Sequence, residues 1–148
     1  MSGRRRLVQV TTVLALAGAG IAGYLTYVHY TGTRIACPTG SCETVQSSSY
    51  ALLGPFPVAL LGLLAYIAIL TGLLLPNAVK WTVVLATSLS GSIFSAYLFA
   101  VQALELHAFC TWCLASDILI TALAALSATA LFTDEPRRQG SSRNGLAS

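Results

Sequence analysis

The chain has 148 residues, of which 55% are hydrophobic and only 9% are charged, and its mean hydropathy is +0.75. A soluble domain carries about 25% charged residues, so this composition excludes a water-soluble globular protein and predicts an integral membrane protein. The net charge of +3 is small. The sequence has no basic, aromatic stretch suited to nucleic acid, so we expect no nucleic-acid partner.

Four stretches are long and apolar enough to cross a membrane, because a spanning helix needs about 20 mostly apolar residues. They cover residues 7–29, 55–75, 81–103 and 110–132. We therefore predict an all-α membrane protein, a four-transmembrane-helix bundle formed by a single domain over residues 1–132. The polar, Gly- and Ser-rich residues 133–148 are predicted to form a disordered cytoplasmic tail.

The first apolar stretch could also be a cleaved signal peptide, because three arginines precede it and it contains small residues. Its apolar run continues past those small residues to Tyr27, which favours a membrane span.

The positive charges predict the orientation of the bundle. With four spans, one side of the membrane carries seven of the eight basic residues: Arg4, Arg5, Arg6, Lys80, Arg137, Arg138 and Arg143. Only Arg34 falls on the other side. Since basic residues stay in the cytoplasm, both termini are predicted to be cytoplasmic. The long loop over residues 30–54 and the turn over residues 104–109 then lie on the outer face of a multi-pass membrane protein.

This orientation brings all four cysteines to the outer membrane face. Cys37 and Cys42 lie in the long loop, whereas Cys110 and Cys113 open the last span as Cys-Thr-Trp-Cys. The outer side of a bacterial membrane is oxidising. A loop pair can meet a water-soluble protein and a pair near the hydrocarbon can meet a lipid-soluble acceptor, so the layout predicts a relay of thiol–disulfide exchange. Three different roles stay open on spacing alone: structural disulfides, a four-thiolate zinc site and inert cysteines.

The segments "CETVQSSSYALLGPFPVALLGLLAY" and "FCTWCLAS" resemble the vitamin K epoxide reductase family in its bacterial homologues, over roughly residues 10–132. The resemblance implies four helices around a quinone, with a periplasmic loop and a short helix between the first and second spans. It implies that Cys37 exchanges with the redox partner, Cys42 relays to Cys110, and Cys113 faces the quinone. Ser48 matches the functional serine of the family.

Two departures from the family pattern are evident. Some bacterial members carry a fused thioredoxin-like domain that is not found in this sequence, so we expect a separate thioredoxin-like partner protein. Vertebrate members carry a tyrosine four residues after the second helix cysteine, and here that position is Asp117.

Asp117 is expected about 6 Å deeper than Cys113 on the same helical face. Two interpretations stay open: a polar anchor bonded to serines of the third span, or a proton or hydrogen-bond donor to the quinone. Besides Cys113 and Asp117, the residues predicted to bind the quinone are Tyr50, Leu53, Phe56, Leu60 and Ile118.

The predicted function is a membrane thiol oxidoreductase that generates disulfides for secreted proteins. Electrons would pass from the partner through both cysteine pairs to a quinone: menaquinone, ubiquinone or vitamin K. DsbB-type oxidases do the same chemistry but place their two cysteine pairs in the reverse order. Two different functions also stay open, namely reduction of vitamin K or its epoxide, and metal binding by a non-enzymatic four-cysteine membrane protein. We expect no metal in the predicted enzyme.

Overall fold

The computed structural model describes residues 2–38 and 40–145, and the side chains of residues 3–38 and 40–133. The long helices are α1 (Ser2–Thr31), α3 (Val58–Gly72), α4 (Asn77–Val101) and α5 (Thr111–Gly145). Between α1 and α3 lie the short helix α2 (Cys42–Gln46), the 3₁₀ turn η1 (Ser49–Ala51) and the strands β1 (Leu52–Leu53) and β2 (Phe56–Pro57). A π-helical turn, η2 (Gln102–Leu106), follows α4.

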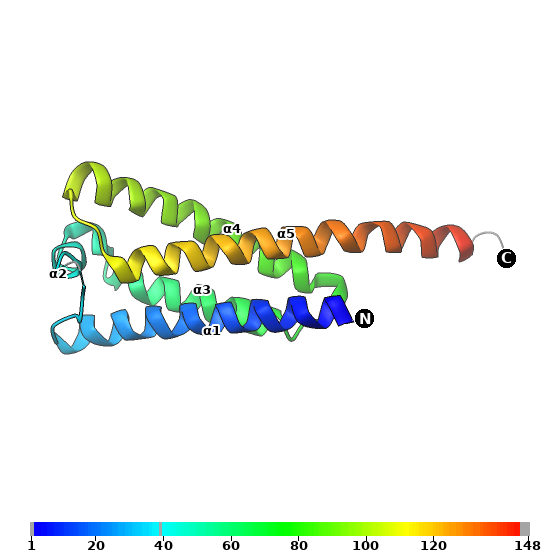
Figure 1. Ribbon diagram of the computed structural model, residues 1–148, viewed down its shortest axis with the longest axis horizontal. Coiled ribbons are helices and arrows are strands. Elements are labelled where there is room, and N and C mark those ends of the chain that lie inside the picture. Colours follow the sequence, from blue (N-terminus) through cyan, green and yellow to red (C-terminus); the bar gives the residue numbers. More distant parts are fainter. Residues whose placement is uncertain (1, 39, 146–148) are drawn as a thin grey trace.

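The four long helices form a bundle in which α1 packs on α3 and α5, and α4 packs on the same two helices. The chain runs up and down, so both chain ends lie at one end of the bundle (Figure 1). The cap, defined as the segment that contains α2, η1, β1 and β2, covers the opposite end. The turn η2 contacts α2 of the cap at that end, and Cys110 and Cys113 near the start of α5 pack in one cluster with Cys42.

Within the described residues, three helical segments are long and apolar enough to cross a membrane, namely Gly3–Thr31, Asn77–Leu106 and Thr111–Thr133. The predicted second span, residues 55–75, is helical only over Val58–Gly72. Fifteen helical residues extend about 22 Å, which is less than the roughly 30 Å of bilayer hydrocarbon. The predicted start of this helix was wrong, because Leu52–Pro57 forms an antiparallel hairpin whose turn contains Gly54 at φ +64°. A glycine adopts this backbone conformation readily, so it suits a tight hairpin turn.

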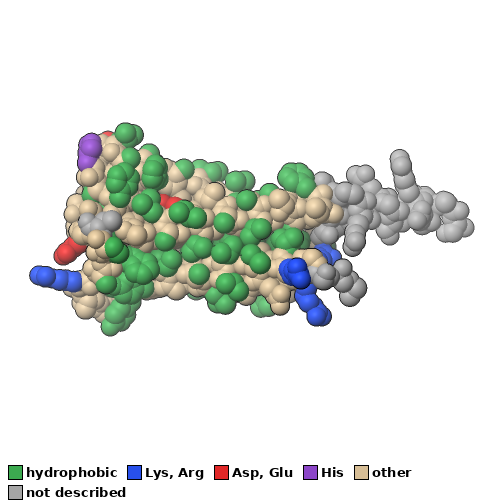
Figure 2. Space-filling model, viewed as in Figure 1, with side chains coloured by type: hydrophobic (Ala, Val, Ile, Leu, Met, Phe, Trp, Pro, Cys, Tyr) green, Lys and Arg blue, Asp and Glu red, His purple; other side chains and the backbone are tan. Residues whose placement is uncertain are grey.

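The surface of the bundle is apolar over much of its length. Large side chains from every long helix face outward, among them Val13 and Leu16 of α1, Ile67 of α3, Ile93 of α4 and Ile118 of α5. Figure 2 shows hydrophobic side chains along the visible face of the bundle, with lysine and arginine confined to its ends. This distribution is the one expected for helices surrounded by lipid.

A close helix contact fills the core below the cap. Tyr66 of α3 is 1% exposed, and its ring lies against Gly18 of α1 so closely that a Cβ at Gly18 would collide with it. Small residues at helix interfaces permit this kind of approach in membrane proteins. Ile69, Val84 and Leu123 extend the same buried cluster towards the end that holds the two termini.

The last helix, α5, continues to Gly145, past the predicted end of the fourth span at residue 132. A disordered tail was predicted from residue 133. Side chains after Thr133, and residues 146–148 altogether, lie outside the described part of the chain, so disorder there stays a prediction.

Candidate functional site

The four cysteines form two disulfides at the cap end of the bundle. Cys37 pairs with Cys42 in the cap, and Cys110 pairs with Cys113 at the start of α5. Their Cα atoms are 5.9 and 5.2 Å apart, within the range usual for disulfides. Cys42 and Cys110 belong to one buried cluster with Val45, and Cys37 and Cys113 pack against it. The fold therefore brings together two pairs that are far apart in the chain.

The burial of the sulfur-bearing residues follows a simple order. Cys37 is partly exposed at the cap end, whereas Cys42 and Cys110 are both 0% exposed. Cys113 is again partly accessible, and it lines a cavity that Cys110 does not line. The two pairs thus share one buried cluster through Cys42 and Cys110, and each pair has one more accessible member.

Two aromatic side chains hold the loop before Cys37 in place. The indole Nε1 of Trp112 donates a hydrogen bond to the carbonyl of Ala36 at 2.8 Å, and the Ala36 N–H donates to the hydroxyl of Tyr24 at 3.2 Å. The rings of Tyr24 and Trp112 lie 5.6 Å apart. Since Trp112 stands between Cys110 and Cys113 in the sequence, this contact ties the loop pair directly to the helix pair.

The start of α5 is fixed by a side chain from η2. Gln102 is 2% exposed, and its carboxamide oxygen accepts a hydrogen bond from the Cys110 N–H at 2.8 Å. The turn then closes through His107, which has the left-handed φ of 47°. The Cys113 N–H donates to the Cys110 sulfur at 3.3 Å. A sulfur that accepts a backbone N–H at a helix N-terminus is favoured as a thiolate.

A cavity of about 350 Å³ lies between the cap and the core cluster. This volume is near the lower end of the range for small-molecule sites, about 300–1,000 Å³. Residues of α1, α3, α4 and α5 form the walls of this cavity. The cap closes one end, and Tyr66 and Ile120 lie at the end nearer the core cluster. Most of the lining is apolar, so the cavity suits a flat, apolar ring better than a charged molecule.

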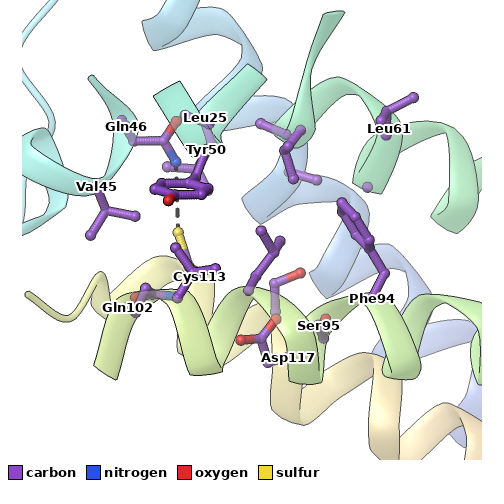
Figure 3. A pocket seen from close by; sticks show the side chains of 18 of the residues that line it. Leu25, Val45, Gln46, Tyr50, Leu61, Phe94, Ser95, Gln102, Cys113 and Asp117 are labelled. Carbon is purple, nitrogen blue, oxygen red and sulfur yellow. Dashed lines mark hydrogen bonds between the residues drawn. The ribbon is translucent and has the colours of Figure 1, made fainter. Parts of the chain in front are cut away.

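A few polar groups face this apolar space. Asp117 lies one turn below Cys113 and beside Ser95 of α4, which is its hydrogen-bond partner (Figure 3). The Oδ2 atom of Asp117 is buried and has no hydrogen-bond partner among the described residues. Next to it, the Tyr66 hydroxyl donates to the Ser116 carbonyl at 2.9 Å. In its protonated form, the Asp117 carboxyl group can donate a hydrogen bond from the unpartnered oxygen to a ligand acceptor such as a ring carbonyl.

The structure places some of the predicted quinone-binding residues in the cavity wall and not others. Cys113, Asp117, Tyr50 and Leu53 line it. The three predicted residues that do not line it are Phe56, Leu60 and Ile118.

These three residues lie on other faces of their elements. Ile118 is 70% exposed and Phe56 is 54% exposed, on the surface of the bundle. On α3 the lining residues Val58, Leu61 and Ala65 form one helical stripe, and Leu60 falls outside it.

Ser48, predicted as a functional residue, also lines the cavity. Its hydroxyl donates a 2.7 Å hydrogen bond to the Val45 carbonyl, and its own carbonyl accepts from the Ala51 N–H at 3.0 Å. With its proton given to Val45, the hydroxyl presents only acceptor lone pairs to the cavity. In this arrangement Ser48 holds the connection between α2 and η1.

Several residues of the site were not predicted from the sequence. Gln46 of α2 lines the cavity, and its amide nitrogen donates to the Cys113 sulfur at 3.6 Å (Figure 3). Gln102 and Tyr66 were also missed. Polar residues inside or beside apolar spans were the available signal, since such residues are costly without a partner.

A sequence profile of one known family matches most of the chain, over residues 9–128. The match includes all four cysteines, the cap, Ser48 and Asp117, and so covers every residue of the site. The apolar helices and the disulfide pairs agree with a membrane oxidoreductase. On this match the chain belongs to the vitamin K epoxide reductase family.

Proposed function

We propose that this protein is a four-span membrane oxidase that passes electrons from a reduced thioredoxin-like protein to a quinone and so generates disulfides for secreted proteins. The observation that carries the proposal is the order of the four cysteines. The partly exposed Cys37 and the cavity-facing Cys113 are joined by two cysteines, Cys42 and Cys110, that share one buried cluster.

The partner reaction begins at Cys37, because it is the less buried member of the loop disulfide. A thiolate of the partner attacks the Cys37 sulfur, the Cys37–Cys42 bond breaks, and Cys42 leaves as a thiolate. The second thiol of the partner then attacks the partner's sulfur in the mixed disulfide, and Cys37 leaves as a thiolate. The partner leaves oxidised, and the loop pair holds two electrons as two thiols.

The transfer between pairs uses the buried contact. The Cys42 thiolate attacks the Cys110 sulfur, the Cys110–Cys113 bond breaks, and Cys113 leaves as a thiolate. Cys37 then attacks Cys42, which restores the loop disulfide and releases Cys110. Two electrons have moved to the helix pair, and no other oxidant or reductant is needed.

The quinone end of the reaction lies in the cavity. When bound there, a quinone accepts two electrons from the helix pair and two protons. Cys113 lines the cavity, so it is the sulfur placed to deliver the electrons. Asp117 is placed to hold a ring oxygen and to supply a proton through its unpartnered oxygen. The apolar walls exclude water and keep the ring beside Cys113.

The topology proposed for this function has both termini in the cytoplasm and all four cysteines outside. In the structure Arg4, Arg5 and Arg6 of α1 and Lys80 of α4 lie at the end opposite the cap, and Arg34 lies near the cap. The basic residues therefore favour the cap end as the outer one. The short α3 counts as the second of four spans in this proposal.

Two different activities compete with the proposal. Reduction of vitamin K or its epoxide would use the same cavity with electrons flowing in the same direction. A four-thiolate metal site would require free thiolates, whereas the structure pairs the cysteines as two disulfides.

The test combines purified protein in lipid nanodiscs with a reduced thioredoxin-like protein and either menaquinone or ubiquinone. Loss of quinone absorbance should require the partner and each of the four cysteines. Quinone reduction that persists in Cys37→Ser with the protein partner would contradict the proposed entry point. One tightly held zinc per purified chain would favour the metal-binding function.

A further inference from the structure

Two side chains of the cap face the helix disulfide from one side of α2. Cys42 shares a buried cluster with Cys110 and Val45, and Gln46 donates its amide hydrogen to the Cys113 sulfur at 3.6 Å. The two residues are four apart, so they lie one above the other on the helix. In Figure 3 the Gln46 amide points at the Cys113 sulfur, with the dashed line between them. Each cysteine of the helix pair therefore has its own counterpart on α2.

We propose that Gln46 stabilises Cys113 as the leaving thiolate and thereby directs the attack of Cys42 to Cys110. This role rests on the relay proposed for the four cysteines, and it makes Gln46 a catalytic residue because its amide contacts the reacting Cys113 sulfur.

The charge that develops during exchange gives the reason. A disulfide sulfur is a weak hydrogen-bond acceptor, whereas a thiolate is a charged one. Hydrogen bonds to charged acceptors are roughly twice as strong as neutral ones. The Gln46–Cys113 bond therefore strengthens as Cys42 attacks Cys110 and the Cys113 sulfur takes the negative charge. Exchange is faster when the leaving thiolate is more stable, so this bond accelerates attack at Cys110.

The alternative attack, by Cys42 on Cys113, is also favoured by a hydrogen bond. If Cys42 attacked Cys113, Cys110 would leave, and the Cys113 N–H already donates to the Cys110 sulfur at 3.3 Å. This donor is a backbone group that no side-chain substitution removes. The Gln46 amide offsets this backbone donor by stabilising Cys113 as the leaving group. Without Gln46, a larger share of the attack should occur at Cys113, with release of Cys110.

The experiment reads the site of attack directly. In a Cys37→Ser background Cys42 is a free thiol without its loop partner, so it can attack the oxidised helix pair without the redox partner. The resulting mixed disulfide accumulates because Cys37 is absent and cannot resolve it. Peptide mapping without reductant should find mainly Cys42–Cys110. Adding Gln46→Leu should raise the share of Cys42–Cys113 several-fold. Thr44→Leu is the matched control, because Thr44 is exposed on the same short helix and should leave the ratio unchanged.

A second measurement needs neither partner nor quinone. In a variant with the other three cysteines replaced by serine, the pH dependence of Cys113 alkylation reports its thiolate fraction. Gln46→Leu should move the midpoint up by about one pH unit, which is about tenfold less thiolate at a given lower pH. Gln46→Glu, which keeps the size but replaces the donor with a carboxylate, should move it at least as far. The other titratable groups lining the cavity, Tyr50, Tyr66 and Asp117, are the same in each variant.

The two failures can be told apart. If neither the disulfide ratio nor the alkylation midpoint changes in Gln46→Leu, the role assigned to Gln46 is overturned. If the midpoint shifts but the wild-type protein passes no electrons from the partner to a quinone, the proposed electron relay is contradicted. The hydrogen bond from Gln46 to the Cys113 thiolate is still supported in that case.

Discussion

Replacing Trp112 with phenylalanine tests whether the loop must be held for the two cysteine pairs to exchange. The substitution keeps an aromatic ring near Tyr24 and removes the Nε1 donor to the Ala36 carbonyl. A hydrogen bond contributes about 0.5–1.5 kcal/mol, and this one is exposed, so water replaces part of it. We take about 0.5–1 kcal/mol, which corresponds to a roughly two- to fivefold smaller ratio of docked to undocked loop. Transfer from loop pair to helix pair should slow, by up to that factor.

The assay is a single turnover in which reduced partner is mixed with oxidised protein and the reaction is stopped by a thiol-alkylating reagent. Mass spectrometry then counts alkylated cysteines in each pair over time. Oxidation of the partner at Cys37 should keep its rate, while thiols at Cys110 and Cys113 should appear more slowly.

Tyr24→Phe removes the other partner of Ala36 and should show a similar effect, with the exposed Tyr27→Phe as its control. Unchanged transfer in both Trp112→Phe and Tyr24→Phe would refute the reasoning. So would a slower partner step with normal transfer.

The quinone site, the core and the topology can each be tested with one change. Asp117→Asn should slow quinone reduction and leave exchange between the partner and the loop pair intact, as followed by quinone absorbance and by partner oxidation; a defect confined to the partner step would contradict the assignment. Gly18→Ala should destabilise the bundle by about 1–3 kcal/mol because its methyl group collides with the Tyr66 ring, whereas Gly20→Ala, with no atom within 4 Å of the new Cβ, should not lower the melting temperature in detergent. A reporter that is active only outside the cytoplasm should be silent when fused after Ser148, and an active reporter would overturn the proposed four-span topology.

The hydropathy of the chain predicted where three long apolar helices lie, because burial in lipid demands continuous apolar residues whatever their neighbours are. It did not predict the start of α3. The predicted span began three residues early, at Pro55, because Phe56 continues the apolar run of α3, and only the Gly54 turn and the flanking prolines mark the end of the hairpin. A hydropathy window averages over such turns.

The pocket residues were harder to predict for a different reason. In a soluble helix the polar face marks the outside, but a membrane helix is apolar towards both lipid and cavity. Ile118 and Asp117 are adjacent in the sequence, yet one faces outward and the other lines the cavity. Asp117 could be placed because it lies one turn from Cys113. Gln46 could not, because it meets Cys113 across 67 residues of sequence, and Gln102 could not, because its contact with the Cys110 N–H depends on the shape of the turn between α4 and α5.

The complete burial of Cys42 and Cys110 also isolates the junction between the two pairs from small thiols in the surrounding fluid. In the proposed relay a free thiol such as glutathione would react through a sulfur that it can reach, and Cys37 is the partly exposed member of the loop pair. Electrons from unrelated thiols would then enter where electrons from the proposed partner enter, and the surface around Cys37 would decide which donors are accepted. Selection among donors would be made once, at the cap, and the quinone of the proposed reaction would be reduced only by thiols that fit there.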